Sequence, residues 1–103
     1  MKIVKVTYTT TADYSEQNKA NIQKVMADMR ELNNPDIKYN TCVSADNKTF
    51  IHTAFFSEAD SEQVLFALPS FKHFQEQLKA SGPEAPPKSE LLTLVGASYT
   101  LFE

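Results

Sequence analysis

The sequence predicts one small domain of the α+β class, on three observations. The chain has 103 residues, of which 42% are hydrophobic and 22% charged, as expected for a single folded domain. Some segments alternate apolar and polar residues, as β-strands do, and others repeat apolar residues every three or four positions, as α-helices do. The order of these segments along the chain is strand, helix, strand, strand, helix, strand.

The first half of the chain predicts a strand and a helix. Residues 2–10 alternate as a strand does, and residues 14–32 have the spacing of an amphipathic helix. Its apolar stripe contains Ile22, Val25, Met29 and Leu32, and the polar residue Asn18 precedes them at the same helical spacing. We expect the Asn-Asn-Pro-Asp sequence at residues 33–36 to end the helix, because proline cannot continue it.

Residues 37–44 and 49–57 predict a β-hairpin. Asp46 and Asn47 tolerate the positive φ that a tight turn demands, and a loop centred on them makes Thr41 face His52. This register puts on one sheet face the side chains of Tyr39, Thr41, Val43, Phe50, His52, Ala54 and Phe56. A shift by one residue would move all of them to the opposite face.

The second half of the chain predicts a helix and a last strand. Residues 58–80 have helical spacing, which Pro69 interrupts, and Gly82 is expected to end the helix in the left-handed conformation. Residues 83–87 are expected to form a loop and residues 91–102 the strand. This strand is apolar on both faces, so we expect it to be buried on both.

This order of elements is that of a ferredoxin-like βαββαβ fold, a four-stranded antiparallel sheet with both helices on one face. The other sheet face would be bare in a monomer. Yet the third and fourth predicted strands carry large apolar side chains on both faces, and a bare apolar face marks an interface. We therefore expect a homodimer that forms through the sheet face.

Composition excludes several classes of partner. The formal net charge is −3 and the ten lysines and arginines are scattered, so the clustered positive face of a nucleic-acid-binding protein is missing. The single cysteine, Cys42, can form no internal disulfide, which is typical of a reducing compartment. The sequence shows neither a signal peptide nor a membrane span. We expect a cytoplasmic protein that binds no nucleic acid and no membrane.

Common cofactor and catalytic motifs are also missing from the sequence. Two glycines are too few for a glycine-rich phosphate loop, and there is no C-x-x-C or G-x-S-x-G motif. The two histidines, His52 and His73, have no pair of acidic residues near them that would complete a metal site. We therefore expect neither a cofactor nor a metal.

His52 is the strongest candidate for a catalytic residue. It lies in the middle of a predicted strand, among aromatic residues that could tune its pKa for the role of a general base. The alternative is a buried structural histidine that is hydrogen-bonded to a neighbouring threonine or tyrosine. The sequence does not decide whether its sheet face lines a pocket or a dimer interface.

Other residues are candidates for the wall of a pocket that binds a polar aromatic molecule. They are Tyr14, Asn18, Tyr39, Phe50, Phe74 and Tyr99. Aromatic residues at strand spacing are more often core residues, so each has a structural alternative. His73 lies away from the centre of the apolar stripe of its helix, and we expect it at the surface or at the rim of a pocket.

Two segments resemble a known family. Residues 50–58, Phe-Ile-His-Thr-Ala-Phe-Phe-Ser-Glu, form an apolar strand that leads into acidic residues, and residues 68–74, Leu-Pro-Ser-Phe-Lys-His-Phe, place a His-Phe pair near a helix break. The chain is similar in these features, and in its whole layout, to the antibiotic-biosynthesis-monooxygenase-like domains of the dimeric α+β barrel superfamily. The resemblance implies a sheet-to-sheet dimer and a pocket in each subunit between helices and sheet.

The resemblance leaves two functions open. Similar domains include cofactor-independent oxygenases of polycyclic phenols, quinol oxygenases and haem-degrading enzymes, which commonly place a tryptophan in the pocket, whereas this chain has none. One hypothesis is a small-molecule-binding or cofactor-independent, monooxygenase-like domain acting on a phenol or quinol. In it, His52 would take the phenolic proton, and Tyr39 or Asn18 would orient the ring. The other is a non-catalytic dimeric module for binding or regulation.

Overall fold

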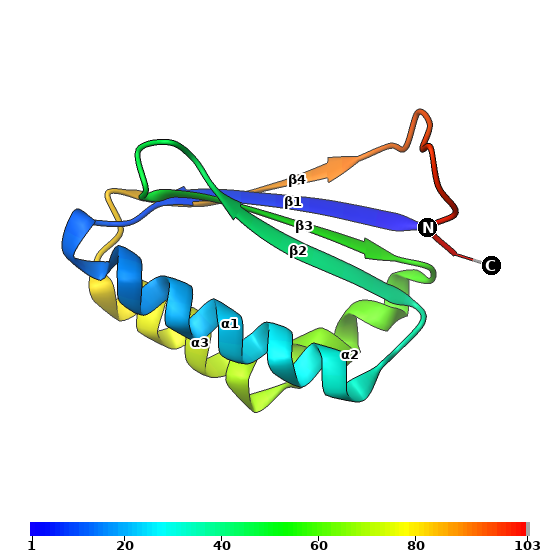
Figure 1. Ribbon diagram of the computed structural model, residues 1–103, viewed down its shortest axis with the longest axis horizontal. Helices are drawn as coiled ribbons and strands as arrows, with labels where there is room; N and C mark the ends of the chain where they lie inside the picture. Colours follow the sequence, from blue (N-terminus) through cyan, green and yellow to red (C-terminus); the bar gives the residue numbers. More distant parts are fainter. Residues whose placement is uncertain (103) are drawn as a thin grey trace.

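The computed structural model describes residues 1–102 as a four-stranded sheet with helices on one face (Figure 1). In chain order the elements are β1 (Lys2–Thr9), the 3-10 turn η1 (Ala12–Tyr14), α1 (Ser15–Leu32), β2 (Ile37–Val43), β3 (Thr49–Phe56), the 3-10 turn η2 (Ala59–Ser61), α2 (Glu62–Phe66), α3 (Pro69–Ser81) and β4 (Ala85–Leu92). The strand order is β2-β3-β1-β4, with all neighbours antiparallel. The predicted α+β class and ferredoxin-like order are confirmed.

The β2–β3 hairpin has the predicted register, with Thr41 opposite His52. Asn47 adopts a φ of 63°, the left-handed conformation that asparagine tolerates. The Asp46 carboxylate accepts hydrogen bonds of 2.9 Å from the backbone N–H groups of the two residues after Asn47, which fixes the loop. Alternate side chains of β3 are therefore buried between sheet and helices, namely Phe50, His52, Ala54 and Phe56.

The core lies between the sheet and the pair of helices α1 and α3, which run side by side beneath it (Figure 1). The core residues are Tyr8, Ile22, Val25, Ile37, Phe50, Ala54, Phe56, Leu65, Phe71, Phe74 and Leu78. Leu32, which we expected to complete the stripe of α1, is 48% exposed. It is the last residue of the helix, and Asn33 turns the chain away with a φ of 48°.

Pro69 separates α2 from α3, as the sequence predicted. It is the first residue of α3, where a proline is tolerated because the N–H groups of the first turn have no partner within the helix. Leu68 before it is extended, which is the conformation that a following proline favours. Gly82 ends α3 with a φ of 68°, the left-handed conformation that we expected.

The last strand lies earlier in the chain than the sequence predicted. β4 includes Pro86 and Pro87, which were expected in a loop, and residues 93–102 form no strand. Prolines are tolerated here because β4 is an edge strand that pairs only with β1. The expected burial on both faces is also wrong, because all eight residues of β4 are exposed. In the tail, Val95 and Tyr99 are exposed as well, whereas Leu101 is buried.

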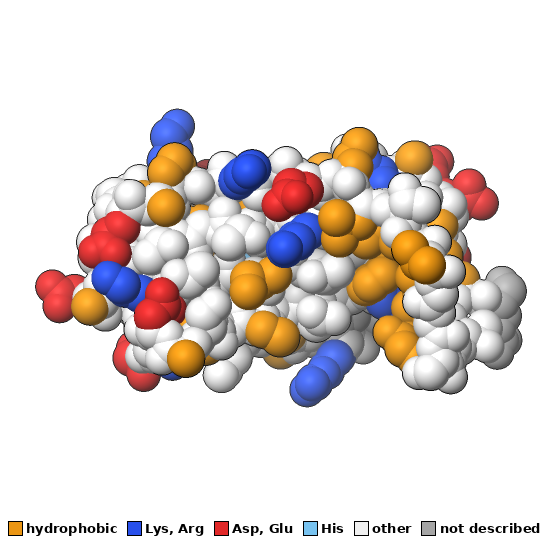
Figure 2. Space-filling view, turned by 90° about the horizontal axis from the view of Figure 1, so that it is seen from above, with side chains coloured by type: hydrophobic (Ala, Val, Ile, Leu, Met, Phe, Trp, Pro, Cys, Tyr) orange, Lys and Arg blue, Asp and Glu red, His pale blue; other side chains and the backbone are white. Residues whose placement is uncertain are grey.

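None of the described helices covers the sheet face opposite α1 and α3, although Ile3 on this face is buried, and Figure 2 shows the molecule from this side. Lysines and acidic side chains are interspersed with hydrophobic ones, which gather at the end where the N-terminus and the tail lie (Figures 1 and 2). From the pairing registers, this face carries Ile3, Lys5, Ile51, Thr53, Phe55, Lys88, Glu90 and Leu92. No helix within residues 1–102 has the length and apolarity needed to cross a bilayer.

Candidate functional site

A cavity of about 590 Å³ lies between the sheet and helices α2 and α3, a volume typical of sites for small molecules. Its wall is mostly apolar and includes Val4, Val6, Ala54, Phe56, Leu65, Phe66, Phe71, Phe74 and Leu78. On the side of β4 the lining residues Pro86, Ser89 and Leu91 are exposed, so the cavity is open to solvent there.

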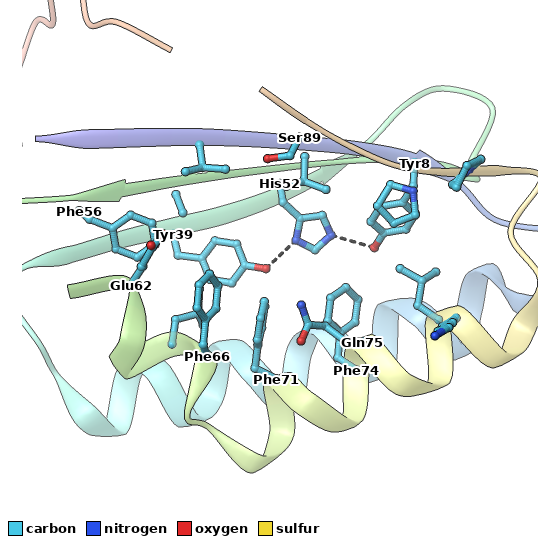
Figure 3. Close-up of a pocket in the computed structure, with 18 of the residues that line it drawn as sticks. Tyr8, Tyr39, His52, Phe56, Glu62, Phe66, Phe71, Phe74, Gln75 and Ser89 are labelled. Atoms are coloured by element: carbon cyan, nitrogen blue, oxygen red, sulfur yellow. Dashed lines mark hydrogen bonds between the residues drawn. The ribbon is translucent and has the colours of Figure 1, made fainter. Parts of the chain in front are cut away.

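His52 extends from β3 into the space between the sheet and the helices, and it is only 6% exposed (Figure 3). Its Nε2 lies 2.8 Å from the hydroxyl of Tyr8, and its Nδ1 lies 2.6 Å from the hydroxyl of Tyr39. The hydroxyl of Thr41 is 3.1 Å from the same Nδ1. The face that holds His52 is thus the cavity side of the sheet, and both ring nitrogens face hydroxyl groups.

Burial sets the charge of these groups. It lowers the pKa of His52 from 6.5 to about 4, because the interior disfavours the charged imidazolium. Burial likewise raises the pKa of Tyr8 and of Tyr39 above the ordinary value for a phenol. All three side chains are therefore neutral at pH 7. A base with so low a pKa is weak, and a proton from the cavity would reach His52 only through a hydroxyl, so its role as a base stays a prediction.

Asn18 does not line the cavity, but it is linked to His52 by a hydrogen bond to Tyr8. It comes from α1 and is fully buried. Its Nδ2 donates a hydrogen bond of 2.9 Å to the Tyr8 hydroxyl, while its Oδ1 has no partner among residues 1–102. Four side chains from four elements thus form one continuous chain of hydrogen bonds: Asn18, Tyr8, His52 and Tyr39.

The structure brings together only some of the residues that the sequence proposed. The cavity wall contains Tyr39, His52 and Phe74. Phe50 stands behind the wall, where its ring stacks on Tyr8 at 5.6 Å. Tyr14 lies outside the cavity and accepts a hydrogen bond of 3.4 Å from Asn21. His73 is exposed on α3 and does not line the cavity, and neither does the tail residue Tyr99.

Sequence reasoning gave Tyr8 no role in the site. The alternation of β1 placed it on the same face as Val4 and Val6, which was a sufficient signal for burial. Its contact with His52 depends on the pairing of β1 with β3, in which Val6 faces His52 and Tyr8 faces Phe50. That pairing joins segments more than forty residues apart, and no turn connects them to fix the register.

Charges are few around the cavity. Lys2 and Glu62 form an ion pair of 3.0 Å on its wall. Lys79 also lines the cavity, and within residues 1–102 no carboxylate comes within ion-pair distance of it. The same part of the chain contains no cluster of three His, Cys, Asp or Glu side chains that could hold a metal ion.

A class of solved structures, some of them named as oxygenases, shares this fold. No family model and no curated protein sequence matches the chain. Among solved structures, an antibiotic biosynthesis monooxygenase superposes with a TM-score of 0.77 at 11% identity, over 93% of this chain and 100% of that one. The structure of Rv0793 from Mycobacterium tuberculosis gives a TM-score of 0.76 at 13% identity, over 95% and 98% of the two chains.

A particular member of this class is SnoaB from Streptomyces nogalater, a cofactor-independent oxygenase. It gives a TM-score of 0.66 at 14% identity, over 94% of each chain. The chain therefore has the fold of the antibiotic biosynthesis monooxygenases, and the resemblance that the sequence suggested is confirmed at the level of the fold.

Proposed function

We propose that the cavity beside His52 binds a phenolic or quinol-type molecule and that the chain oxygenates it without a cofactor. The observation that carries this proposal is an open, largely apolar cavity with a buried row of hydroxyl groups and one histidine on its wall. The rings of Phe66, Phe71 and Phe74 offer surfaces for an aromatic ligand (Figure 3). The hydroxyl of Tyr39 offers a hydrogen bond to a phenolic oxygen.

The reaction needs no reductant other than the phenol. A phenol and O₂ yield a quinone and water: one oxygen atom enters the ring, and the other leaves as water with two hydrogens of the substrate. Loss of the phenolic proton makes the ring electron-rich enough to reduce O₂. The protein would contribute a dry cavity, the orientation of the ring and the stabilisation of the phenolic oxygen. The fold shared with SnoaB supports this proposal.

Ligand binding is expected to stabilise the fold. A naphthol or hydroquinone at a hundred times its Kd should add ~2.7 kcal/mol to the free energy of unfolding. For a domain of this size, that corresponds to a rise in melting temperature of roughly 10–20 °C. The measurement is thermal unfolding of the pure protein with and without each compound. If none of the naphthols and hydroquinones raised the melting temperature, this result would contradict the proposal.

A matched pair of variants locates the binding site. Ser89 lines the cavity from the exposed strand β4, so Ser89→Trp should fill the cavity at little cost to folding and remove the thermal shift. Gln77 is exposed on α3 and does not line the cavity, so Gln77→Trp should leave the shift unchanged. Equal shifts in both variants would place the ligand elsewhere.

Oxygen uptake separates catalysis from binding. With a bound naphthol or hydroquinone and no added metal or cofactor, the protein should consume O₂ and release a quinone. Binding without uptake would instead support a non-catalytic binding module. The low pKa of His52, about 4, and the occupation of both its ring nitrogens favour that second candidate.

We also propose that the chain acts as a cytoplasmic homodimer that forms through the outer sheet face. The apolar side chains of Ile51, Phe55 and Leu92 on this face support the proposal, and the free thiol of Cys42 is consistent with a reducing compartment. Sedimentation should give twice the monomer mass of 11.6 kDa for the wild type and the monomer mass for Phe55→Asp. Phe66→Asp, at the cavity, should remain dimeric. A monomeric wild type would refute the dimer.

A further inference from the structure

We propose that Asn18 is a positioning residue that fixes the tautomer of His52, so that Tyr39 donates a hydrogen bond into the cavity and the site selects an ionised phenol over a neutral one. Only the last step of this inference rests on the proposed phenolic ligand.

The first step is the orientation of the Asn18 amide. Its Nδ2 faces the Tyr8 hydroxyl at 2.9 Å, and its Oδ1 has no partner among the described residues. The opposite orientation would turn the NH₂ group, with its two donor hydrogens, into the buried space that Oδ1 now fills. Buried N–H groups without a partner are rarer than under-satisfied carbonyl oxygens. The amide therefore presents its donor to Tyr8.

The second step is the direction of the Tyr8 hydroxyl. Its oxygen accepts the hydrogen bond from Asn18, and its own single hydrogen needs an acceptor. Within residues 1–102, the one other hydrogen-bond partner of this hydroxyl is Nε2 of His52, at 2.8 Å. Tyr8 thus donates to Nε2, which must be free of hydrogen to accept.

The third step is the tautomer of His52. A neutral imidazole carries one hydrogen, so with Nε2 as an acceptor the hydrogen sits on Nδ1. Nδ1 then donates to the hydroxyl oxygen of Tyr39 at 2.6 Å, with the oxygen of Thr41 at 3.1 Å as a second acceptor. The hydrogen of the Tyr39 hydroxyl cannot point back at Nδ1. The Thr41 hydroxyl also neighbours this group, and because Tyr39 lines the cavity, a ligand oxygen there competes with Thr41 as the acceptor of this hydrogen.

The charges around the cavity agree with an anionic ligand. The titratable and charged groups that face it are Lys2 and Tyr8 of β1, Tyr39 of β2, His52 of β3, Glu62 of α2 and Lys79 of α3. Strand β4 contributes none. The ion pair between Lys2 and Glu62 is neutral overall, which leaves Lys79 as the one charge on the cavity wall without an ion-pair partner within residues 1–102. A hydrogen bond to an ionised oxygen is also stronger than one to a neutral oxygen.

The tautomer of His52 is measurable in the ligand-free protein. The chain has only two histidines, so the His73→Asn variant, changed at an exposed position, leaves a single imidazole in the ¹⁵N NMR spectrum. We expect the shifts of an Nδ1–H tautomer. At a pH high enough to ionise the introduced buried carboxyl group, Asn18→Asp should reverse the two nitrogen shifts, because a carboxylate would accept from Tyr8. An Nε2–H tautomer in the folded protein with Asn18 intact would overturn the inference, even if the Asn18→Asp variant fails to fold.

The ionisation state of the ligand is measured with a nitronaphthol, whose ionised form absorbs at a longer wavelength. At one pH unit below the pKa of the free compound, the bound compound should be mostly ionised, a shift of at least tenfold in its ionisation equilibrium. Tyr39→Phe should reduce this shift while leaving the His52 tautomer unchanged. A nitronaphthol that binds in neutral form would contradict the inference. Failure of every naphthol to bind a protein with the Nδ1–H tautomer would instead contradict the proposed function.

Discussion

Replacement of Phe74 by alanine is expected to lower the free energy of unfolding by ~3–5 kcal/mol. Phe74 is only 4% exposed, and its ring centroid lies 5.3 Å from that of His52, 5.8 Å from that of Phe71 and 6.4 Å from that of Tyr8. The hydrogen bonds of His52 and Tyr8 hold these neighbours in place, so they cannot collapse into the space that is left. Small domains are stable by only about 5–15 kcal/mol, so this loss is a large fraction of the free energy of unfolding.

Urea unfolding of Phe74→Ala against the wild type is the measurement. Phe66→Ala is the matched control, because Phe66 also lines the cavity but is 41% exposed, so this variant should lose only about 1–2 kcal/mol. The structure shows the Phe74 ring packed more tightly than the Phe66 ring. An equal loss of unfolding free energy in the two variants would contradict this difference.

Acid is expected to destabilise the fold through His52. The pKa of this histidine falls from 6.5 in the unfolded chain to about 4 in the folded one, so the unfolded state binds the proton more readily. Its contribution to stability is therefore complete above pH ~6.5 and is lost as the pH falls towards ~4. A difference of this size corresponds to about 3 kcal/mol, to be read from urea midpoints at intervals of pH.

Two glutamine variants separate this effect from general acid unfolding. His52→Gln removes the titrating group, so the stability of this variant should change less between pH 7 and pH 4 than that of the wild type. His73→Gln changes an exposed histidine and should follow the wild-type curve. Carboxylates such as Asp28 and Asp46, whose pKa values are lowered by hydrogen bonds, contribute to acid unfolding in all three proteins. A His52→Gln curve parallel to that of the wild type would contradict the assignment.

Local chemistry made the hairpin and the helix breaks predictable from the sequence. Asp46 and Asn47 fix a turn by their own hydrogen bonds and φ preference, so the register of β2 with β3 follows from a few residues. Pro69 begins α3 and Gly82 ends it through their own backbone preferences, which are also local properties. The last strand was not predictable in this way. Its position depends on pairing with β1, and an edge strand accepts Pro86 and Pro87 that a central strand would exclude.

The candidate site was predictable only in part for a similar reason. The sequence singled out His52 because it lies in the middle of an aromatic strand. It singled out Tyr39 because a tyrosine can bind a polar aromatic ligand, and Asn18 because its amide could orient a substrate. It did not decide which face the helices cover, since β3 carries large residues on both. The link between Asn18 and His52 passes through Tyr8 and requires α1, β1 and β3 to be in place at once.

Strand β4 is less stable towards local unfolding than the rest of the domain. Its side chains are exposed, so separating it from β1 would cost mainly the backbone hydrogen bonds between the two strands and little buried apolar surface. The three other strands and α1 hold most of the core and would remain folded. Local unfolding of this kind needs far less free energy than global unfolding. Because β4 is also a wall of the cavity, the molecule can exchange its contents with solvent at one edge while the rest of the domain stays intact.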